Sequence, residues 1–235
     1  MEIHQIFGRD ESKTRSLAEN LSATPVFDIS AIDENTDLLL LAVKDDVISK
    51  VTAALGKRNE IVAHTSGTAS SGLLADCSPN YGVFYPLQTF SKEKEVNFHD
   101  VPILVSANNS TAQNALLYLG QKLSETVQQI SDRQRELLHL AAVMVNNFTN
   151  HLFALSNEIL EENELQPDLL HPLIKETFAK TQLNDPATIQ TGPAVRGDMA
   201  TINRHMELLK KHPQILQVYQ SLTSSIISKH GKNEV

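Results

Sequence analysis

The segment 131–160 carries uncharged polar side chains whose types and spacing suit ligand binding. At about 100° per residue in a helix, His139, Asn146 and Asn150 fall on one side, and Asn147 and His151 continue it. Asparagine disfavours helix, and a solvated helix face usually carries lysine and glutamate instead. Amides and imidazoles are neutral hydrogen-bonding groups. This face therefore fits either the wall of a ligand cleft or a buried polar seam between helices or subunits.

Further candidates stand where predicted strands end, because ligands of open parallel sheets bind outside the carboxyl ends of the strands. Arg9 could hold a phosphate with its guanidinium fork, or it could pair with Asp10 or Glu11. The segment 64–67 offers hydroxyls and a glycine, or it is an ordinary strand-to-helix turn. The residues on this rim are Arg9, Val43, Lys44, Asp45, His64, Thr65, Ser66 and Gly67.

Arg196 lies in the segment 190–198, which contains glycine and proline and has no apolar period of its own. We interpret the segment as a loop, and loops of this kind are often functional. Arg196 is a candidate clamp for a carboxylate or phosphate, and the alternative is a pair with Asp198, which should also cap the following helix.

Two other kinds of chemistry are not indicated. His139 and His151 have no cysteine or carboxylate between them that would complete a metal site, so we predict no bound metal. Ser66 and His64 lack the Gly-x-Ser-x-Gly elbow that surrounds a nucleophilic serine. The polar candidates therefore indicate binding through hydrogen bonds and charge.

The elements that position these residues change type along the chain. Strand and helix patterns alternate up to residue 130, which indicates an open α/β sheet. The segment 37–43 contains a continuous apolar run after Asp37 and is typical of a parallel strand covered on both faces. The predicted strands are 2–7, 25–29, 37–43, 60–64, 81–85, 101–106 and 126–130, and a helix is predicted at 110–123.

Beyond residue 130 the pattern is helical only. Ser131 and Gln134 stand in a capping-box relation, which predicts one long helix over 131–160. Further helices are predicted over 167–181, 198–211 and 213–228. We therefore expect a sheet domain over residues 1–130 and a helical domain over residues 131–235.

Composition limits the class of protein. The chain has 235 residues, with 20 Lys and Arg against 28 Asp and Glu, which gives a net charge of −8. Nucleic acid and acidic membrane surfaces are therefore poor partners. The apolar run 38–43 is too short to cross a bilayer, and no secretory pattern opens the sequence, so we expect a cytoplasmic protein. The lone Cys77 has no partner for an internal disulfide.

Three segments together carry a family resemblance: Tyr81–Ser91, Leu138–His151 and Gln190–Asp198. They resemble the Rossmann-like proteins with a C-terminal helical domain of unknown function, which are often labelled NADP-dependent oxidoreductases. More distantly, the chain is similar to pyrroline-5-carboxylate reductase and the 6-phosphogluconate dehydrogenase superfamily. The resemblance covers nearly the whole chain. It implies a Rossmann-like, mostly parallel α/β sheet followed by an all-α domain.

The resemblance also assigns roles. Arg9 matches the basic residue that takes the 2′-phosphate of NADP, Ala42–Asp45 matches the stretch that passes the ribose and pyrophosphate, and His64–Gly67 matches the segment near the nicotinamide. The long helix would supply the substrate side, with His139 and Asn147 as its catalytic residues. The residues expected to bind substrate are Gln88, Asn146, Asn150, His151 and Arg196.

Two departures from the family pattern affect this assignment. The related dehydrogenases place a lysine one turn before an asparagine on this helix, whereas here Val143 precedes Asn147, so His139 or His151 would replace the lysine. A Rossmann domain also begins with a strand, a Gly-x-Gly-x-x-Gly turn and a helix that hold the pyrophosphate. This chain begins at what resembles the second strand. We therefore expect the first strand to be absent and NADP binding to be weak or absent.

These observations lead to hypotheses from different classes. The first is an NADP-dependent oxidoreductase that transfers a hydride to a small carbonyl or imine substrate and forms a homodimer through its helical domain. The alternative is a non-catalytic binding or scaffold protein of the same fold that has lost cofactor binding. A third is an incomplete sequence, which an in-frame strand and glycine-rich turn upstream of Met1 would reveal.

Overall fold

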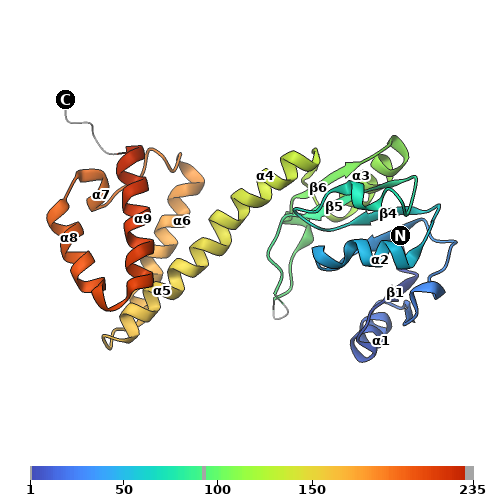
Figure 1. Ribbon diagram of the computed structural model, residues 1–235, viewed down its shortest axis with the longest axis horizontal. Helices are drawn as coiled ribbons and strands as arrows, with labels where there is room; N and C mark the ends of the chain where they lie inside the picture. Colours follow the sequence, from blue (N-terminus) through green and yellow to red (C-terminus); the bar gives the residue numbers. More distant parts are fainter. Residues whose placement is uncertain (1, 92–93, 231–235) are drawn as a thin grey trace. The chain divides into compact units, whose positions relative to one another are not determined.

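The computed structural model describes residues 2–91 and 94–230. Its internal contacts divide the chain into two compact units, Met1–Val145 and Asn146–Val235 (Figure 1). Within the described ranges, no helix combines the length and the apolar character needed to span a bilayer. The two units are described separately below.

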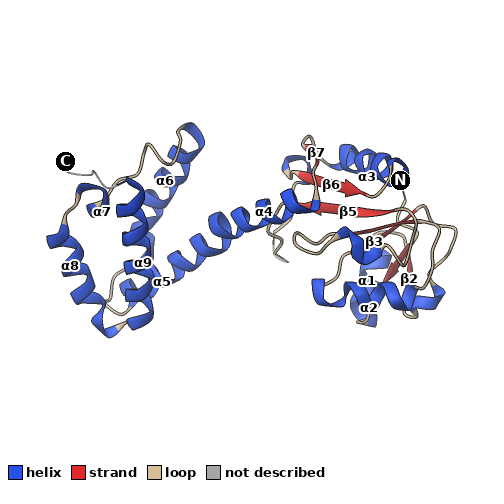
Figure 2. Cartoon of the chain, turned by 45° about the horizontal axis from the view of Figure 1, so that its top comes forward, coloured by secondary structure: helices blue, strands red, loops and turns tan. Residues whose placement is uncertain are grey.

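The strands of the first unit form two sheets (Figure 2). The smaller is a parallel pair of β1 (Gln5–Phe7) and β2 (Thr24–Val26). The larger has five strands in the order β3 (Leu38–Leu41), β4 (Ile61–His64), β5 (Tyr81–Pro86), β6 (Ile103–Ala107) and β7 (Val127–Gln129). Among the described strands of this sheet, β5 and β6 pair antiparallel, and the other neighbours pair in parallel. The predicted Rossmann-like, mostly parallel sheet is confirmed.

The sheet is interrupted between β1 and β3. Over residues 2–91 and 94–230, β1 pairs only with β2 and β3 pairs only with β4. In a Rossmann-like sheet, the first strand lies between the strands that correspond to β1 and β3. Within the described ranges the sheet therefore has a break here, and the backbone groups on one edge of β1 and one edge of β3 have no ladder partners.

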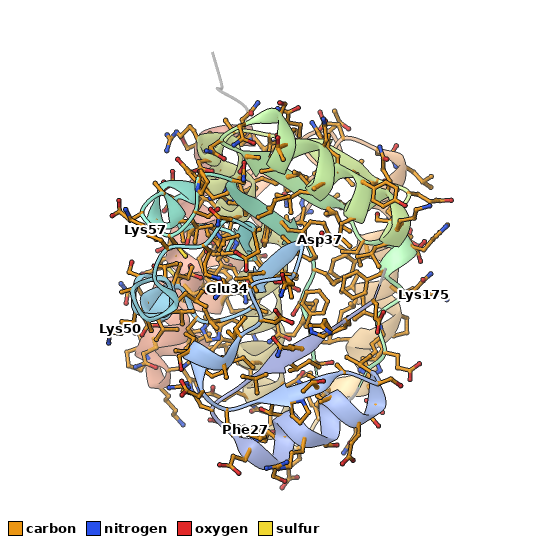
Figure 3. All side chains as sticks on the ribbon, turned by 90° about the vertical axis from the view of Figure 1, so that its right-hand side faces the viewer. Phe27, Glu34, Asp37, Lys50, Lys57 and Lys175 are labelled. Atoms are coloured by element: carbon orange, nitrogen blue, oxygen red, sulfur yellow. The ribbon has the colours of Figure 1, made fainter. Side chains whose placement is uncertain are left out.

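Three α-helices accompany these strands: α1 (Glu11–Asn20), α2 (Ile48–Leu55) and α3 (Ser110–Leu123). Short 3₁₀ turns are η1 (Ile29–Ala31), η2 (Asp45–Val47), η3 (Ser71–Leu74) and η4 (Phe98–Asp100). The strand predicted over 25–29 ends early because the Asp28 side chain accepts a hydrogen bond from Ser30 N and starts η1. Beside it, the Arg15 guanidinium of α1 lies 4.5 Å from the centre of the Phe27 ring, labelled in Figure 3.

The larger sheet is covered on both faces. Val62 and Ala63 are adjacent in β4 and fully buried, yet they belong to different apolar clusters because successive strand residues point to opposite faces. Val62 packs with Ile48 and Leu55 of α2, and Ala63 belongs to the cluster that contains Leu116 of α3. Helices on both faces of the sheet thus keep the strand ends fixed.

One long helical segment follows the sheet. It consists of α4 (Asp132–Ala142), a π-helical stretch η5 (Val143–Phe148) and α5 (Thr149–Glu161). Ser131 and Gln134 form the predicted capping box. The secondary structure changes from sheet to helix near residue 130. The compact units divide at Val145, and α4 contacts the sheet through the pairs Tyr85–His139 and Ser106–Asp132.

The second unit is entirely helical within its described residues. It contains α5, η6 (Pro167–Leu170), α6 (His171–Leu183), α7 (Pro193–Arg196), α8 (Met199–Leu208), η7 (Leu209–Lys211) and α9 (Pro213–His230). The prediction that residues 190–198 form a loop was wrong in part. Pro193 begins the short helix α7, and Gly197, with φ of 69°, ends it. Asp198 caps α8 as predicted and accepts a hydrogen bond from Thr201 N.

Candidate functional site

Tyr85, at the carboxyl end of β5, and His139, on α4, form a hydrogen-bonded pair. Tyr85 Oη lies 3.1 Å from His139 Nδ1, and the two rings meet edge to face. Burial raises the pKa of Tyr85, although the nearby charge of Arg135 acts in the opposite direction. The phenol is therefore protonated at neutral pH. When this phenol donates to Nδ1, the ring proton of His139 lies on Nε2.

The loop after β4 lies against this pair. A Cβ at Gly67 would come 2.5 Å from His139 Nδ1 and 3.0 Å from Tyr85 Cζ, closer than side chains tolerate. Only glycine fits here without moving one of the two rings. The structure thus brings together His139 and the segment 64–67, two candidates that are far apart in the sequence.

Hydrogen bonds within the loop and to η2 hold it in place. Ser66 Oγ accepts from the backbone N–H groups of Thr68 and Ala69. Thr68 Oγ1 donates to Asp45 Oδ2 at 2.7 Å. Partial desolvation opposes ionisation of Asp45, but hydrogen bonds from Thr68 and Ser66 outweigh it, so its pKa lies below the ordinary value. An anionic carboxylate therefore stands beside the loop.

His64 supports the loop from the sheet side. Its ring is fully buried, Nδ1 accepts from Ser66 N at 3.2 Å, and Nε2 lies 3.3 Å from Ser70 O. These contacts fix the tautomer with the proton on Nε2, and burial lowers the pKa of the ring so that it stays neutral. The ring is not accessible to a ligand. A cofactor contact from His64 would have to come from its backbone.

The other rim candidates are solvent-exposed. Arg9 follows β1, and within residues 2–91 and 94–230 it makes no ion pair, because Asp10 binds Lys13 and Glu11 binds Arg15. The pairing of Arg9 with these neighbouring acids is therefore not seen. The exposed candidates after β3 and β5 are Ala42, Val43, Lys44 and Gln88.

The candidates of the second unit are also exposed. The side chains of Asn146, Asn147, Asn150 and His151 make no hydrogen bond to any residue that the structure describes. They begin in the π-helical stretch η5, a feature frequent at functional sites. His151 also borders a mostly apolar hollow of about 340 Å³ against α9. A buried polar seam within one chain is therefore not observed.

Arg196 ends α7 and is exposed. It forms no ion pair with the part of the chain that is described. The pKa of Asp198 is lowered mainly by its hydrogen bonds from Thr201, and the charge of Arg196 adds to this effect. The Arg196 guanidinium is therefore available to other groups.

Sequence reasoning missed three residues near the centre of the site: Tyr85, Asp132 and Arg135. Tyr85 stands at the carboxyl end of a predicted strand, which was a usable signal, but its partner is distant in the sequence. Arg135 lies one helical turn before His139, so helical spacing was a signal that could have placed it near the pair. Its burial was not visible from the sequence.

A Rossmann-like, mostly parallel sheet followed by a helical region defines the fold class, and ligands of such sheets bind outside the carboxyl ends of the strands. The family model "Domain of unknown function (DUF2520)" matches residues 101–226, and the chain belongs to this family. The resemblance inferred from the sequence is confirmed. No curated protein matches the sequence.

Three solved structures illustrate the relationship. The "putative NADP oxidoreductase BF3122" of Bacteroides fragilis is 34% identical, with a TM-score of 0.88 over 96% of this chain and 88% of that chain. An imine reductase from Myxococcus stipitatus in complex with NADP⁺ is 13% identical, with a TM-score of 0.65 over 98% and 88%. The 1-pyrroline-5-carboxylate reductase of Streptococcus pyogenes is 14% identical, with a TM-score of 0.59 over 96% and 88%. The last two show a shared fold alone.

Proposed function

We propose that the chain is an NADP-dependent reductase that adds a hydride to the carbon of a small carbonyl or imine, while Tyr85 and His139 supply the proton. The observation that carries this proposal is the 3.1 Å contact between Tyr85 Oη and His139 Nδ1 beside Gly67, at the carboxyl ends of β4 and β5. The 34% identity to a protein described as an NADP oxidoreductase supports it.

The described residues fit one end of NADP better than the other. Arg9 is an exposed cation suited to a 2′-phosphate, Asp45 is a carboxylate suited to ribose hydroxyls, and Thr65–Gly67 offer backbone and a hydroxyl near the pair. The pyrophosphate normally binds backbone amides of a glycine-rich turn, and over residues 2–91 and 94–230 no such turn adjoins the break between β1 and β3. When bound, NADPH would supply the hydride.

The pair is arranged to deliver a proton. Addition of a hydride to a C=O or C=N carbon leaves a negative oxygen or nitrogen that must be protonated. His139 Nε2 has no hydrogen-bond partner among the described residues, so its N–H is the free donor of the pair. As Nε2 gives its proton to the substrate, Nδ1 takes the phenol proton of Tyr85. The imidazole thus loses one proton and gains another, and the tyrosinate later regains a proton from water.

We assign the substrate side to the polar helix face and its surroundings. Asn147 would orient the acceptor through its side-chain amide. Amide, imidazole and guanidinium groups suit a small polar substrate, and an anionic substrate group would bind Arg196. The remaining residues assigned to substrate are Gln88, Asn146, Asn150 and His151.

We also propose a homodimer formed through the helical domain. The described part of the second unit buries only a few apolar side chains, namely Ala194, Ile202, Leu209 and Ile215. By contrast, Leu169 is 69% exposed, Leu173 63% and Leu208 68%. Apolar side chains exposed in such numbers mark a surface that another protein covers.

The experiment is an assay of NADPH oxidation with a panel of cyclic imines and ketones, at NADPH concentrations high enough to offset weak binding. We expect turnover that falls about 100-fold or more in His139→Gln and Tyr85→Phe, since positioned proton donors contribute about this much. Absence of both NADPH binding and turnover would instead support the non-catalytic alternative, and turnover unchanged by both substitutions would show that Tyr85 and His139 do not supply the proton.

A further inference from the structure

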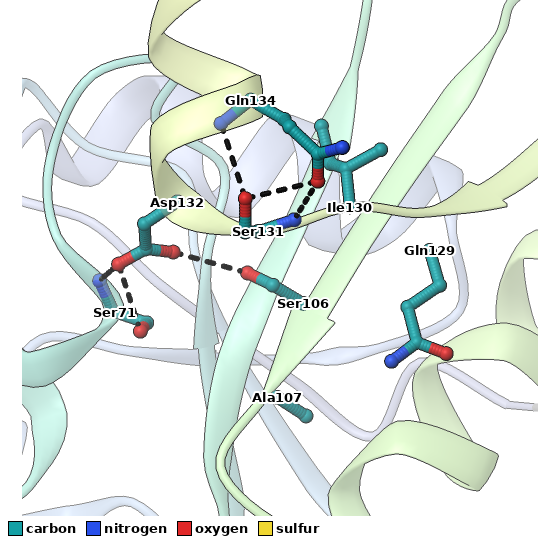
Figure 4. A pocket seen from close by; sticks show the side chains of 8 residues that line it. All are labelled: Ser71, Ser106, Ala107, Gln129, Ile130, Ser131, Asp132 and Gln134. Carbon is teal, nitrogen blue, oxygen red and sulfur yellow. Dashed lines mark hydrogen bonds between the residues drawn. The ribbon is translucent and has the colours of Figure 1, made fainter.

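A dense polar network joins the start of α4 to the sheet. The Asp132 carboxylate accepts hydrogen bonds from Ser70 Oγ, Ser106 Oγ, and both the N–H and the hydroxyl of Ser71 (Figure 4 shows those from Ser71 and Ser106). Arg135 Nη1 donates to it at 2.7 Å. Burial opposes ionisation of Asp132, but the hydrogen bonds from Ser71 and Arg135 dominate and lower its pKa to about 2.

Arg135 is almost completely enclosed, with 1% of its surface exposed. Its guanidinium binds Asp132 and Ser106 through Nη1 and the carbonyl of Ala69 through Nη2, whereas Nε has no partner among the described residues. Burying the charge of Arg135 is costly, and apolar residues of similar volume often stabilise a protein as well as, or better than, a buried ion pair. Stability alone is therefore a weak explanation for this pair.

The network clamps the loop 66–71 from the helix side. His64 holds the same loop from the sheet side through Ser66 N and Ser70 O. Between these two anchors, Gly67 touches His139, which lies one helical turn beyond Arg135 on α4. The loop 66–71 is thus held on two sides, by the network of Asp132 and Arg135 and by His64. Its contact with His139 lies between these two supports.

We propose that Asp132 and Arg135 are positioning residues that lock the loop 66–71 to α4 and so fix His139 Nδ1 against Tyr85 Oη. The inference rests on the proposed function, in which that pair delivers the proton. Neither Asp132 nor Arg135 touches the reacting atoms. They act by keeping the donor and the loop in one rigid arrangement, which matters because small misplacements of a catalytic group cost large factors in rate.

The test follows the His139 ring by ¹⁵N NMR on the full chain, without substrate or cofactor. His139→Gln identifies its signals, and Tyr85→Phe shows their dependence on the phenol. Arg135→Lys keeps the positive charge but removes the guanidinium group that donates to several partners at once. Ser71→Ala removes the hydroxyl that donates to Asp132 and leaves no buried charge without a partner. Arg133→Ala is the matched control, because Arg133 lies on the same helical turn but is exposed and, among the residues the structure describes, pairs with Glu136 alone.

We expect the parent and Arg133→Ala to show one fixed tautomer with the proton on Nε2. Arg135→Lys and Ser71→Ala should lose this pattern and show averaged signals while their far-UV circular dichroism is unchanged. If Arg135→Lys does not fold, Ser71→Ala decides. A fixed tautomer in the folded variants would overturn the proposal and leave the network with a purely structural role.

This measurement separates failure of the inference from failure of the proposed function. If Tyr85→Phe leaves the His139 signals of the parent unchanged, the pair itself is absent in solution and both proposals fail together. If the pair is present but no reductase activity is found, only the proposed function fails. Where activity is found, Ser71→Ala should lower kcat about 10-fold or more with KM for NADPH unchanged.

Discussion

Gly67 and His139 are in such close contact that a Cβ on the glycine would lie 2.5 Å from the imidazole Nδ1. This contact couples the end of β4 to α4 through backbone rather than through a flexible side chain. It also makes the geometry of the Tyr85–His139 pair sensitive to a single methyl group.

Gly67→Ala should therefore displace His139 or Tyr85. We expect a loss of about 1 to 3 kcal/mol in the free energy of unfolding, typical of overpacking, together with loss of the fixed His139 tautomer. Urea unfolding and ¹⁵N NMR measure both. Gly72→Ala is the control, because its Cβ would meet only Ser70 Oγ at 3.4 Å. If both variants had the same free energy of unfolding and the same His139 signals, the close contact between Gly67 and His139 would be contradicted.

Because of Asp132, the free energy of unfolding should decrease at acidic pH. Its folded pKa of about 2 lies below the ordinary value of 3.8, so the stabilisation is complete above about pH 4 and is lost as the pH falls toward 2. With allowance for partial exposure, the shift corresponds to about 2 kcal/mol. Asp132→Asn should thus be clearly less stable than the parent at pH 7 and approach it near pH 2.

Urea unfolding from pH 2 to 7 tests this difference. Asp132→Asn also leaves the buried Arg135 without its counter-charge, which adds to the deficit at neutral pH. The exposed Asp46→Asn serves as the control and should follow the parent throughout. A constant difference between Asp132→Asn and the parent across the whole pH range would argue against an ionised, bonded Asp132.

The break between β1 and β3 predicts weak NADPH binding by the 235-residue chain. Without a glycine turn, the pyrophosphate loses several charge-assisted hydrogen bonds at about 1.5 to 3 kcal/mol each, which weakens affinity by orders of magnitude. Adding roughly 25 to 30 residues that supply a strand, a turn and a helix should restore binding. Titration by NADPH fluorescence compares the two proteins. Tight binding by the shorter one would mean that another surface holds the phosphates.

Arg196→Lys should weaken binding of an anionic substrate while the melting temperature stays nearly unchanged. The guanidinium is exposed and makes no ion pair with the described residues, so its loss costs the fold little, but lysine cannot bind a carboxylate through two parallel hydrogen bonds. Thermal unfolding and ligand titration give the two values. A large fall in melting temperature would assign Arg196 a structural role instead.

Dimer formation through the helical domain should depend on its exposed leucines. Leu169→Lys combined with Leu173→Lys places charges on two side chains that are 69% and 63% exposed, so the fold of one chain should tolerate them whereas an apolar interface would not. Sedimentation measures the change from dimer to monomer. A parent chain that sediments as a monomer at high concentration would refute the proposed dimer.

The sequence by itself determined the elements, because their signals lie in neighbouring residues. The helix over 110–123 was predicted with the observed limits, and the Ser131–Gln134 capping box marked the start of the long helix. The apolar run 38–43 indicated a strand, which is observed as β3, although Leu40 is 43% exposed and the strand is not fully covered on both faces. Each of these depends on periodicity or on a motif a few residues long.

Only the tertiary structure decided which polar residues form the site. Tyr85 and His139, or Asp132 and Ser71, are distant in the sequence, and they meet because strand order and helix packing bring them together. The same packing hides the ring of His64 and the charge of Arg135, which no local pattern indicates. Burial and pairing are properties of the folded surroundings, so the same side chain is a ligand-binding group at one position and an internal support at another.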